Sequence, residues 1–204
     1  PEASKEGQIS CSGTGWSYDH STDTLTLTSN SGTYDFSLAN PQDTTKTTSA
    51  DSDVACKIEI QSGAKINGGT FNRTVTNNGT IERGTFAGGV TNSGTITNGT
   101  FACSVTNYSN IESKGTFNGT VENYGGTISS GTFKGTVQNW YGTISGGTFH
   151  EKVLNSNGEI TGGTFAAGLS ANHNTVTGGV FNGKTGLNSV TGGHFIKWDD
   201  DYSK

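Results

Sequence analysis

The chain has 204 residues and a formal net charge of −5, with 29% hydrophobic and 14% charged residues. These values exclude a thick hydrophobic core, and the negative charge excludes a basic surface for nucleic acid or anionic membranes. No apolar run approaches the roughly 18 residues that span a bilayer, so we expect no membrane insertion of this fragment. Because it starts with neither Met nor a signal peptide, we expect a mature secreted protein or a piece of a longer one.

Residues 1–62 are expected to form a β-rich cap and lead-in. Within them, residues 15–28 (GWSYDHSTDTLTLT) predict paired strands around a polar turn. Residues 53–66 alternate between polar and apolar side chains and are expected to lead into the first full coil of a repeat. A cap is needed there because the first strand of a repeated sheet would otherwise expose unpaired backbone groups.

An internal repeat of mostly 15 or 16 residues occupies residues 63–195. It is marked by Gly-Thr-Phe, which becomes Gly-Val-Phe and Gly-His-Phe at the end. Its aromatic column consists of Phe71, Phe86, Phe101, Phe117, Phe133, Phe149, Phe165, Phe181 and Phe195. A second column consists of Val75, Val90, Val105, Val121, Val137, Val153 and Leu169, and a third consists of Ile66, Ile81, Ile96, Ile111, Ile128, Ile144, Ile160, Val176 and Val190.

The intervals between these columns predict the fold class. Val follows Phe by four residues, Ile follows Val by six or seven, and Phe follows Ile by five or six. Neither a helical period nor a long alternating strand produces such intervals. Three short strands per coil, each with one large residue pointing inward, do produce them. We therefore predict an all-β, single-stranded parallel β-helix of about nine coils, stacked about 4.8 Å apart.

A column of Asn residues two positions after Val predicts a structural ladder at one corner. Asn bonds to neighbouring peptides and tolerates left-handed backbone geometry. The ladder consists of Asn77, Asn92, Asn107, Asn123, Asn139 and Asn155.

This pattern resembles the parallel β-helix (β-solenoid) proteins of the pectate-lyase-like kind, over residues 63–195. The Asn ladder and the unequal sides of the coil imply a right-handed helix by that resemblance. The N-terminal segment is similar to the opening of repeat-rich secreted or surface proteins of Gram-positive bacteria. An extracellular or cell-surface location is therefore expected.

Residues 196–204 are expected to close the other end as a cap or tail. Trp198 can plug the end of the rod, and the Asp residues that follow it, Asp199 to Asp201, would discourage end-to-end growth.

Cysteine usage leaves two alternatives open. A Cys11–Cys56 disulfide would suit an extracellular protein, and three separate thiols are the alternative, with Cys103 inside the repeat. The chain has no Cys-x-x-Cys pair and no Cys/His cluster, so no metal and no cofactor is expected.

Many β-helix proteins are polysaccharide lyases or hydrolases, which makes a carbohydrate-active enzyme the main alternative function. The chain has no Asp between Val54 and Trp198, and its only Arg residues are Arg73 and Arg83. Glu82 and Glu112 share an outward column two coils apart, but nothing on an open face would raise the pKa of either carboxyl. We therefore expect no enzymatic activity and assign no catalytic residue.

Outward Thr and Ser residues beside the Ile column suggest a minor alternative, an ice-binding solenoid. The pairs are Thr95/Thr97, Thr127/Ser129, Thr143/Ser145, Thr175/Thr177 and Ser189/Thr191. Glu82, Asn110, Glu112 and Glu159 interrupt this array, and β-branched residues suit the outer face of any strand.

The candidate site is an outward aromatic column directly after the Asn ladder. Three consecutive coils place Tyr108, Tyr124 and Trp140 there, with Tyr141 beside the last. A ring ladder that shields the corner is one interpretation. The other is an exposed strip that contacts a glycan or a host or neighbouring surface protein. We predict a non-catalytic extracellular or cell-surface β-solenoid for structural display or adhesion, with glycan binding through this strip.

Overall fold

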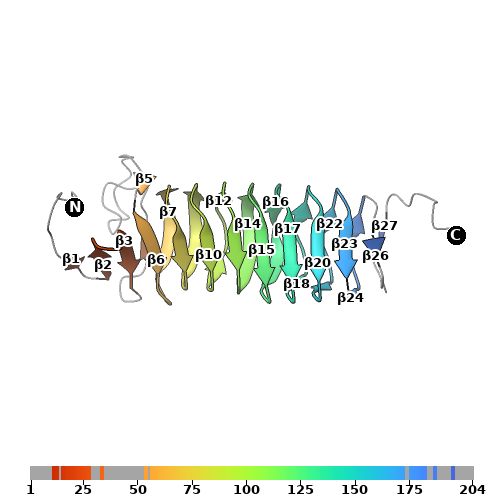
Figure 1. The fold of residues 1–204 in the computed structure, drawn as a ribbon, viewed down its shortest axis with the longest axis horizontal. Coiled ribbons are helices and arrows are strands. Elements are labelled where there is room, and N and C mark those ends of the chain that lie inside the picture. Colours follow the sequence, from red (N-terminus) through yellow and green to blue (C-terminus); the bar gives the residue numbers. More distant parts are fainter. Residues whose placement is uncertain are drawn as a thin grey trace, which may run out of the picture.

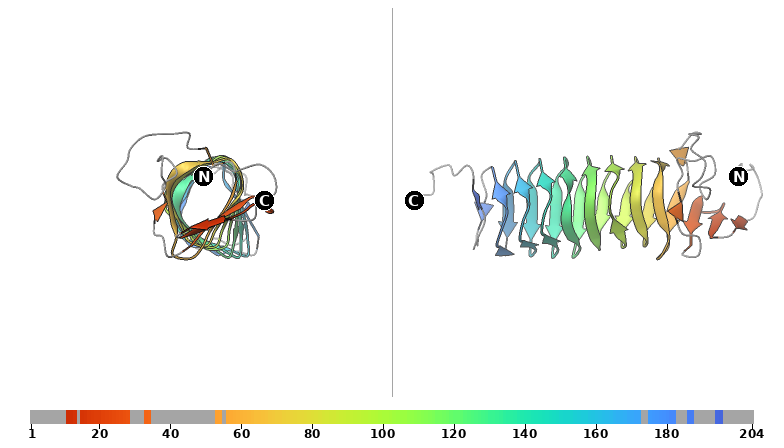
Figure 2. Two further views of the ribbon diagram at one scale, coloured as in Figure 1. Left: turned by 90° about the vertical axis from the view of Figure 1, so that its left-hand side faces the viewer. Right: turned by 180° about the vertical axis from the view of Figure 1, so that it is seen from behind.

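The computed structural model describes residues 11–13, 15–28, 33–34, 53–54, 56–172, 175–182, 186–187 and 194–195. All regular elements in these ranges are β-strands, which confirms the all-β prediction. Figure 1 shows them stacked along one axis as a rod, and the end-on view in Figure 2 shows the coils superposed. Eight coils, from β6–β7 to β23–β25, repeat the same parallel pairing, so the predicted β-solenoid is confirmed. Its hand stays a prediction.

The first strand of every coil belongs to one 12-stranded sheet, which we call the Val–Asn sheet. These strands are β6 (Lys57–Ile60), β8 (Val75–Asn77), β10 (Val90–Asn92), β13 (Val105–Asn107), β15 (Val121–Tyr124), β17 (Val137–Trp140), β20 (Val153–Ser156) and β23 (Leu169–Asn172). Alternation points Val and Asn inward and leaves the residue between them on the outer face.

The rest of each coil forms a second sheet of 15 strands. In four coils the Ile and Phe positions share one long strand: β7 (Lys65–Phe71), β9 (Thr80–Phe86), β14 (Asn110–Phe117) and β16 (Thr127–Phe133). In the others they lie on two short strands: β11 (Thr95–Ile96) and β12 (Thr100–Phe101), β18 (Thr143–Ile144) and β19 (Thr148–Phe149), β21 (Glu159–Ile160) and β22 (Thr164–Phe165), and β24 (Thr175–Val176) and β25 (Val180–Phe181).

A bend with positive φ two residues before most of the Phe residues explains the Gly of the Gly-Thr-Phe motif. Gly147 has φ 112°, and a Cβ atom there would lie 3.1 Å from the Phe133 ring. A residue with a side chain would therefore meet both a strained backbone and a packed ring. The bend turns the strand so that the next Phe points into the core.

The core is a set of stacked columns, as predicted. Successive Phe rings from Phe71 to Phe181 lie 4.6–4.9 Å apart between centroids, with interplanar angles of 5–13°. The Ile and Val columns are likewise buried as far as Val176 and Leu169, and Val190 lies outside the described residues. Phe195 on β27 (His194–Phe195) pairs with Phe181 and so continues the backbone register.

The Asn ladder is buried and continuous from Asn77 to Asn155. The Nδ2 of each Asn donates to the Oδ1 of the Asn in the next coil, at 2.6 Å in every step. Each Nδ2 from Asn92 onward also donates to a carbonyl of its own corner, such as Gly142 O for Asn139 at 2.9 Å. Buried amides without these partners would be strongly destabilising, so the ladder both fills and satisfies the corner.

The N-terminal end combines an antiparallel meander with strands that already pair in parallel with the solenoid. β1 (Cys11–Gly13), β2 (Trp16–Asp19) and β3 (Thr24–Leu27) pair antiparallel, and β3 then pairs in parallel with β6. β4 (Thr33–Tyr34) and β5 (Asp53–Val54) pair with β7. The apolar columns thus continue upstream of residue 63, where the repeat predicts their start, through Ile58, Leu25 and Tyr34. No Gly-Thr-Phe motif marks these coils, so the sequence pattern does not reveal them.

Of the two cysteine alternatives, free thiols fit the described structure better than a Cys11–Cys56 disulfide. Cys56 is a free, partly buried thiol, and Cys103 is free and exposed. The sheet order β1–β2–β3–β6 places Cys11 three strands from the start of β6, about 14 Å away at the usual strand spacing. A disulfide needs Cα atoms within about 7 Å of each other.

At the C-terminal end, β26 (Gly186–Leu187) and β27 pair with β23 and β25. Trp198 and the predicted cap of residues 196–204 lie outside the described residues. The described part of the chain contains no helix that is long and apolar enough to cross a membrane.

Candidate functional site

The predicted aromatic column is present on the outer face of the Val–Asn sheet. Tyr124, Trp140 and Ser156 are direct neighbours in the parallel register of β15, β17 and β20. Asn107 pairs with Asn123, which places Tyr108 beside Tyr124. Their rings stack with centroids 5.7 Å apart and an interplanar angle of 22°. We call Tyr108, Tyr124, Trp140 and Tyr141 the aromatic strip.

The strip is the main exposed apolar surface in the described ranges. The exposed fractions are 53% for Tyr108, 40% for Tyr124 and 72% for Tyr141, whereas Trp140 is partly buried. The ring ladder joins Tyr108 to Tyr124, and no ring contact joins Trp140 to it within these ranges. The strip is therefore too open to serve simply as a continuous shield for the corner.

Leu154 adds a fifth apolar side chain that the sequence reasoning missed. It is 38% exposed and lies on the outer face of β20, directly opposite Gln138 of β17. The same column holds Thr106, Glu122 and Gln138 in the preceding coils. The presence of a single Leu in an otherwise polar outward column could have identified this position from the sequence.

The corner that carries Tyr141 has one more residue than the corners of the early coils. The added residues are Gly125, Tyr141 and Asn157, all with positive φ, at 73°, 58° and 54°. The next residue must be Gly: a Cβ at Gly142 would lie 2.2 Å from the Nδ2 of Asn123. The ladder thus determines the path of the corner, and Trp140 and Tyr141 project from it.

Trp140 has an unusual environment for its indole. Its Nε1 is buried and has no hydrogen-bond partner in the described structure. A buried donor without an acceptor is destabilising, typically by about 1–3 kcal/mol. The indole therefore packs against the rod without a polar anchor.

The strip offers no positive charge at its centre. Its outward neighbours on the same strands are Glu122 and Gln138, both partly buried. Lys134 and Lys152 of these coils precede the strands, at the opposite end from the ladder corner. An anionic ligand would consequently meet a carboxylate before it met a cation.

In the described part of the chain, two groups with raised pKa values lie at the N-terminal end, away from the strip. Burial raises the pKa of the Cys56 thiol, and the charge of Asp23 raises it further. Burial also raises the pKa of Tyr34, whose hydroxyl donates to the Gly15 carbonyl. Neither group forms part of a recognisable catalytic arrangement.

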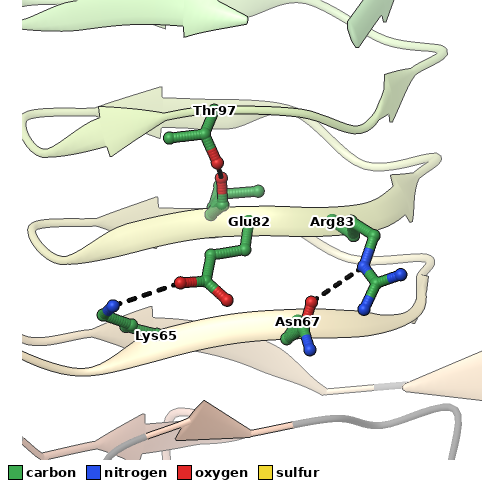
Figure 3. Close-up of polar contacts among 6 residues, drawn as sticks. Lys65, Asn67, Glu82, Arg83 and Thr97 are labelled. Atoms are coloured by element: carbon green, nitrogen blue, oxygen red, sulfur yellow. Dashed lines mark hydrogen bonds and ion pairs between the residues drawn. The ribbon is translucent and has the colours of Figure 1, made fainter. Parts of the chain in front are cut away.

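Three of the acidic and basic side chains considered for catalysis, Glu82, Arg73 and Arg83, are paired with structural neighbours. Glu82 lies 3.1 Å from Lys65, and the Nε of Arg83 donates to Asn67 at 2.8 Å, as Figure 3 shows. Arg73 lies 3.6 Å from Asp23 at the N-terminal meander. In the ranges that the structure describes, no group of three or more His, Cys, Asp or Glu residues could hold a metal.

The Thr and Ser side chains of the ice-binding alternative do not present a regular hydroxyl array. In the column before Ile, Asn110 and Glu159 separate the Thr residues. In the column after it, hydroxyls donate to carbonyls of the preceding coil, as Thr97 does to Ile81 at 3.1 Å and Ser129 to Ile111 at 3.3 Å. Because these hydroxyls donate to the backbone, they are less available to bind the water molecules of an ice surface.

The chain matches no protein-family model, and neither curated proteins nor solved structures show a significant similarity to it. The geometry of the strip is therefore the basis for the function proposed for this protein.

Proposed function

We propose that the protein is a non-catalytic, extracellular or cell-surface β-solenoid for display or adhesion that binds glycan through the aromatic strip. One observation carries this proposal: the exposed large apolar side chains of the described residues all lie on one face of neighbouring coils, at Tyr108, Tyr124, Tyr141 and Leu154. Scattered apolar residues need no explanation, but a contiguous group marks a contact surface.

The chemistry of the strip favours sugar rings. The C–H face of a pyranose is apolar and packs against the face of an aromatic ring, which removes both surfaces from water. Gln138, Ser156 and Asn157 border the rings and supply hydrogen-bonding groups for hydroxyls. A partner protein could use the same anchors, but this polar border suits a glycan better.

The resemblance to pectate-lyase-like β-helix proteins and to surface proteins of Gram-positive bacteria is consistent with such a role. It also keeps a carbohydrate-active enzyme as the alternative. Arg73, Arg83 and Glu82 all have structural partners, which favours binding over turnover.

A glycan array tests the proposal, with the protein compared with Tyr124→Ala and Trp140→Ala variants. Both variants remove apolar contact area from the strip, so we expect each to lower binding at least tenfold. His150→Ala, an exposed change outside the strip, is the control and should bind like the parent. No binding by the parent, or equal binding by all variants, would contradict the proposal. Cleavage of any bound polysaccharide would favour the enzyme instead.

A further inference from the structure

The backbone of Tyr141 has a conformation that suits its residue type poorly. Its φ of 58° lies in the left-handed region, where a Cβ atom crowds the following carbonyl oxygen. Non-Gly residues there are mostly Asn or Asp, and a bulky aromatic residue is an outlier. Something other than local preference must account for the Tyr.

The adjacent coils build the same corner with residues that suit it. Gly125 has φ 73° and Asn157 has φ 54° at the positions that match Tyr141. Gly has no Cβ, and Asn tolerates this conformation. Since both corners form without an aromatic ring, the ring of Tyr141 is not required by the fold.

Packing does not compensate for the strain either. Tyr141 is 72% exposed, more than the other large apolar side chains of the described residues. Its neighbour Trp140 buries an unpaired Nε1, whereas the next coil has Ser156 in that register. Tyr141 therefore has an unfavourable backbone conformation and Trp140 has a buried donor without an acceptor, whereas Ser156 and Asn157 have neither problem. Locally unfavourable features of this kind are concentrated at functional sites.

We infer that Tyr141 is an affinity-determining contact for a neutral pyranose ring, retained despite its effect on stability. The inference rests on the proposed glycan binding of the aromatic strip. The exposed ring can accept a sugar without rearrangement. We specify a neutral sugar because the Glu122 carboxylate borders the strip and would repel an anionic sugar. The lysines of these coils precede the strands, at the far end from the rings, and would not offset this repulsion.

The test uses Tyr141→Asn, which copies the next coil, and Asn157→Tyr as its reciprocal control. Thermal unfolding is measured for both, and calorimetric binding to cellotetraose, xylotetraose, mannotetraose and tetra-N-acetylchitotetraose is measured for Tyr141→Asn and for His150→Ala. We expect Tyr141→Asn to raise Tm by about 2–4 °C and Asn157→Tyr to lower it similarly. We expect Tyr141→Asn to weaken binding at least tenfold, while His150→Ala, an exposed change outside the strip, retains it.

Each outcome distinguishes the inference from the function on which it rests. If Tyr141→Asn binds as tightly as the parent, the inference is overturned and glycan binding stands. If Tm does not rise, the strain argument fails and the inference fails with it. If the parent binds none of the four sugars, proposed function and inference fail together, whatever the change in Tm.

Discussion

Asn123 lies in the middle of the amide ladder and shows how one residue type determines a corner. Its Nδ2 donates to Asn139 and to the Gly126 carbonyl, and its Oδ1 accepts from Asn107. Because the side chain is buried, these bonds replace those that water would make. The repeat made this ladder predictable, since only a stacked position would keep Asn in six coils.

Asn123→Ala should destabilise the protein by about 2–5 kcal/mol, because it leaves Asn107 and Asn139 each with an unmet group. Chemical denaturation measures the loss. Asn77→Ala is the matched control, because Asn77 is the first rung and joins only one ladder neighbour, Asn92. Its loss should be smaller, although Asn77 Oδ1 also accepts from the Gly79 N–H, and a larger loss for Asn77→Ala than for Asn123→Ala would mean that the ladder bonds contribute little.

The aromatic strip was predictable as a column, but the conformation of Tyr141 was not. The change from six to seven residues between Val and Ile shows that the corner gains a residue, without showing which residue adopts positive φ. Leu154 was missed because alternation along one strand does not reveal which outward position is exposed beside a neighbouring coil.

At the scale of the strand, the spacing of apolar residues predicted where each strand lies, and glycine decides how it bends. The Ile and Phe positions are separate strands in some coils and one bulged strand in others. Between Ile111 and Phe117 the extra residue turns Ser113 inward, where its Oγ accepts from the Gly115 N–H at 2.6 Å. The interval signalled an irregularity there, but the choice of inward residue depends on tertiary packing.

Gly147→Ala should destabilise the protein by about 2–4 kcal/mol, since it adds a Cβ beside the Phe133 ring at an unfavourable φ. Thermal or chemical unfolding provides the measurement. Gly125→Ala is its control: it has positive φ, but a Cβ there would meet nothing within 4 Å. That variant should lose only about 1 kcal/mol. Similar losses in both would show that the ring contact is unimportant.

At the scale of the molecule, each coil contacts mainly its two neighbours, so the rod is built by local repetition. The sequence therefore predicted the architecture well where the motif recurs. It did not reveal that β3 to β5 already pair in parallel with the first regular coil. Tyr34 and Val54 take the Ile and Phe positions there, but the interval between them is far longer than the five residues that usually separate Ile from Phe. Function was less predictable still, since a β-solenoid supports both binding and catalysis.

NMR mapping of a neutral oligosaccharide titration tests most directly whether the aromatic strip is the binding surface. Amide and aromatic resonances are followed while cellotetraose, xylotetraose, mannotetraose and tetra-N-acetylchitotetraose are added in turn. Saturable shifts should appear for at least one sugar and centre on Tyr108, Tyr124, Trp140, Tyr141 and Leu154. The outer face of the second sheet, where β9 carries Glu82 and Arg83, should not respond. Shifts centred on that face, or no saturable shift with any of the four sugars, would contradict the account.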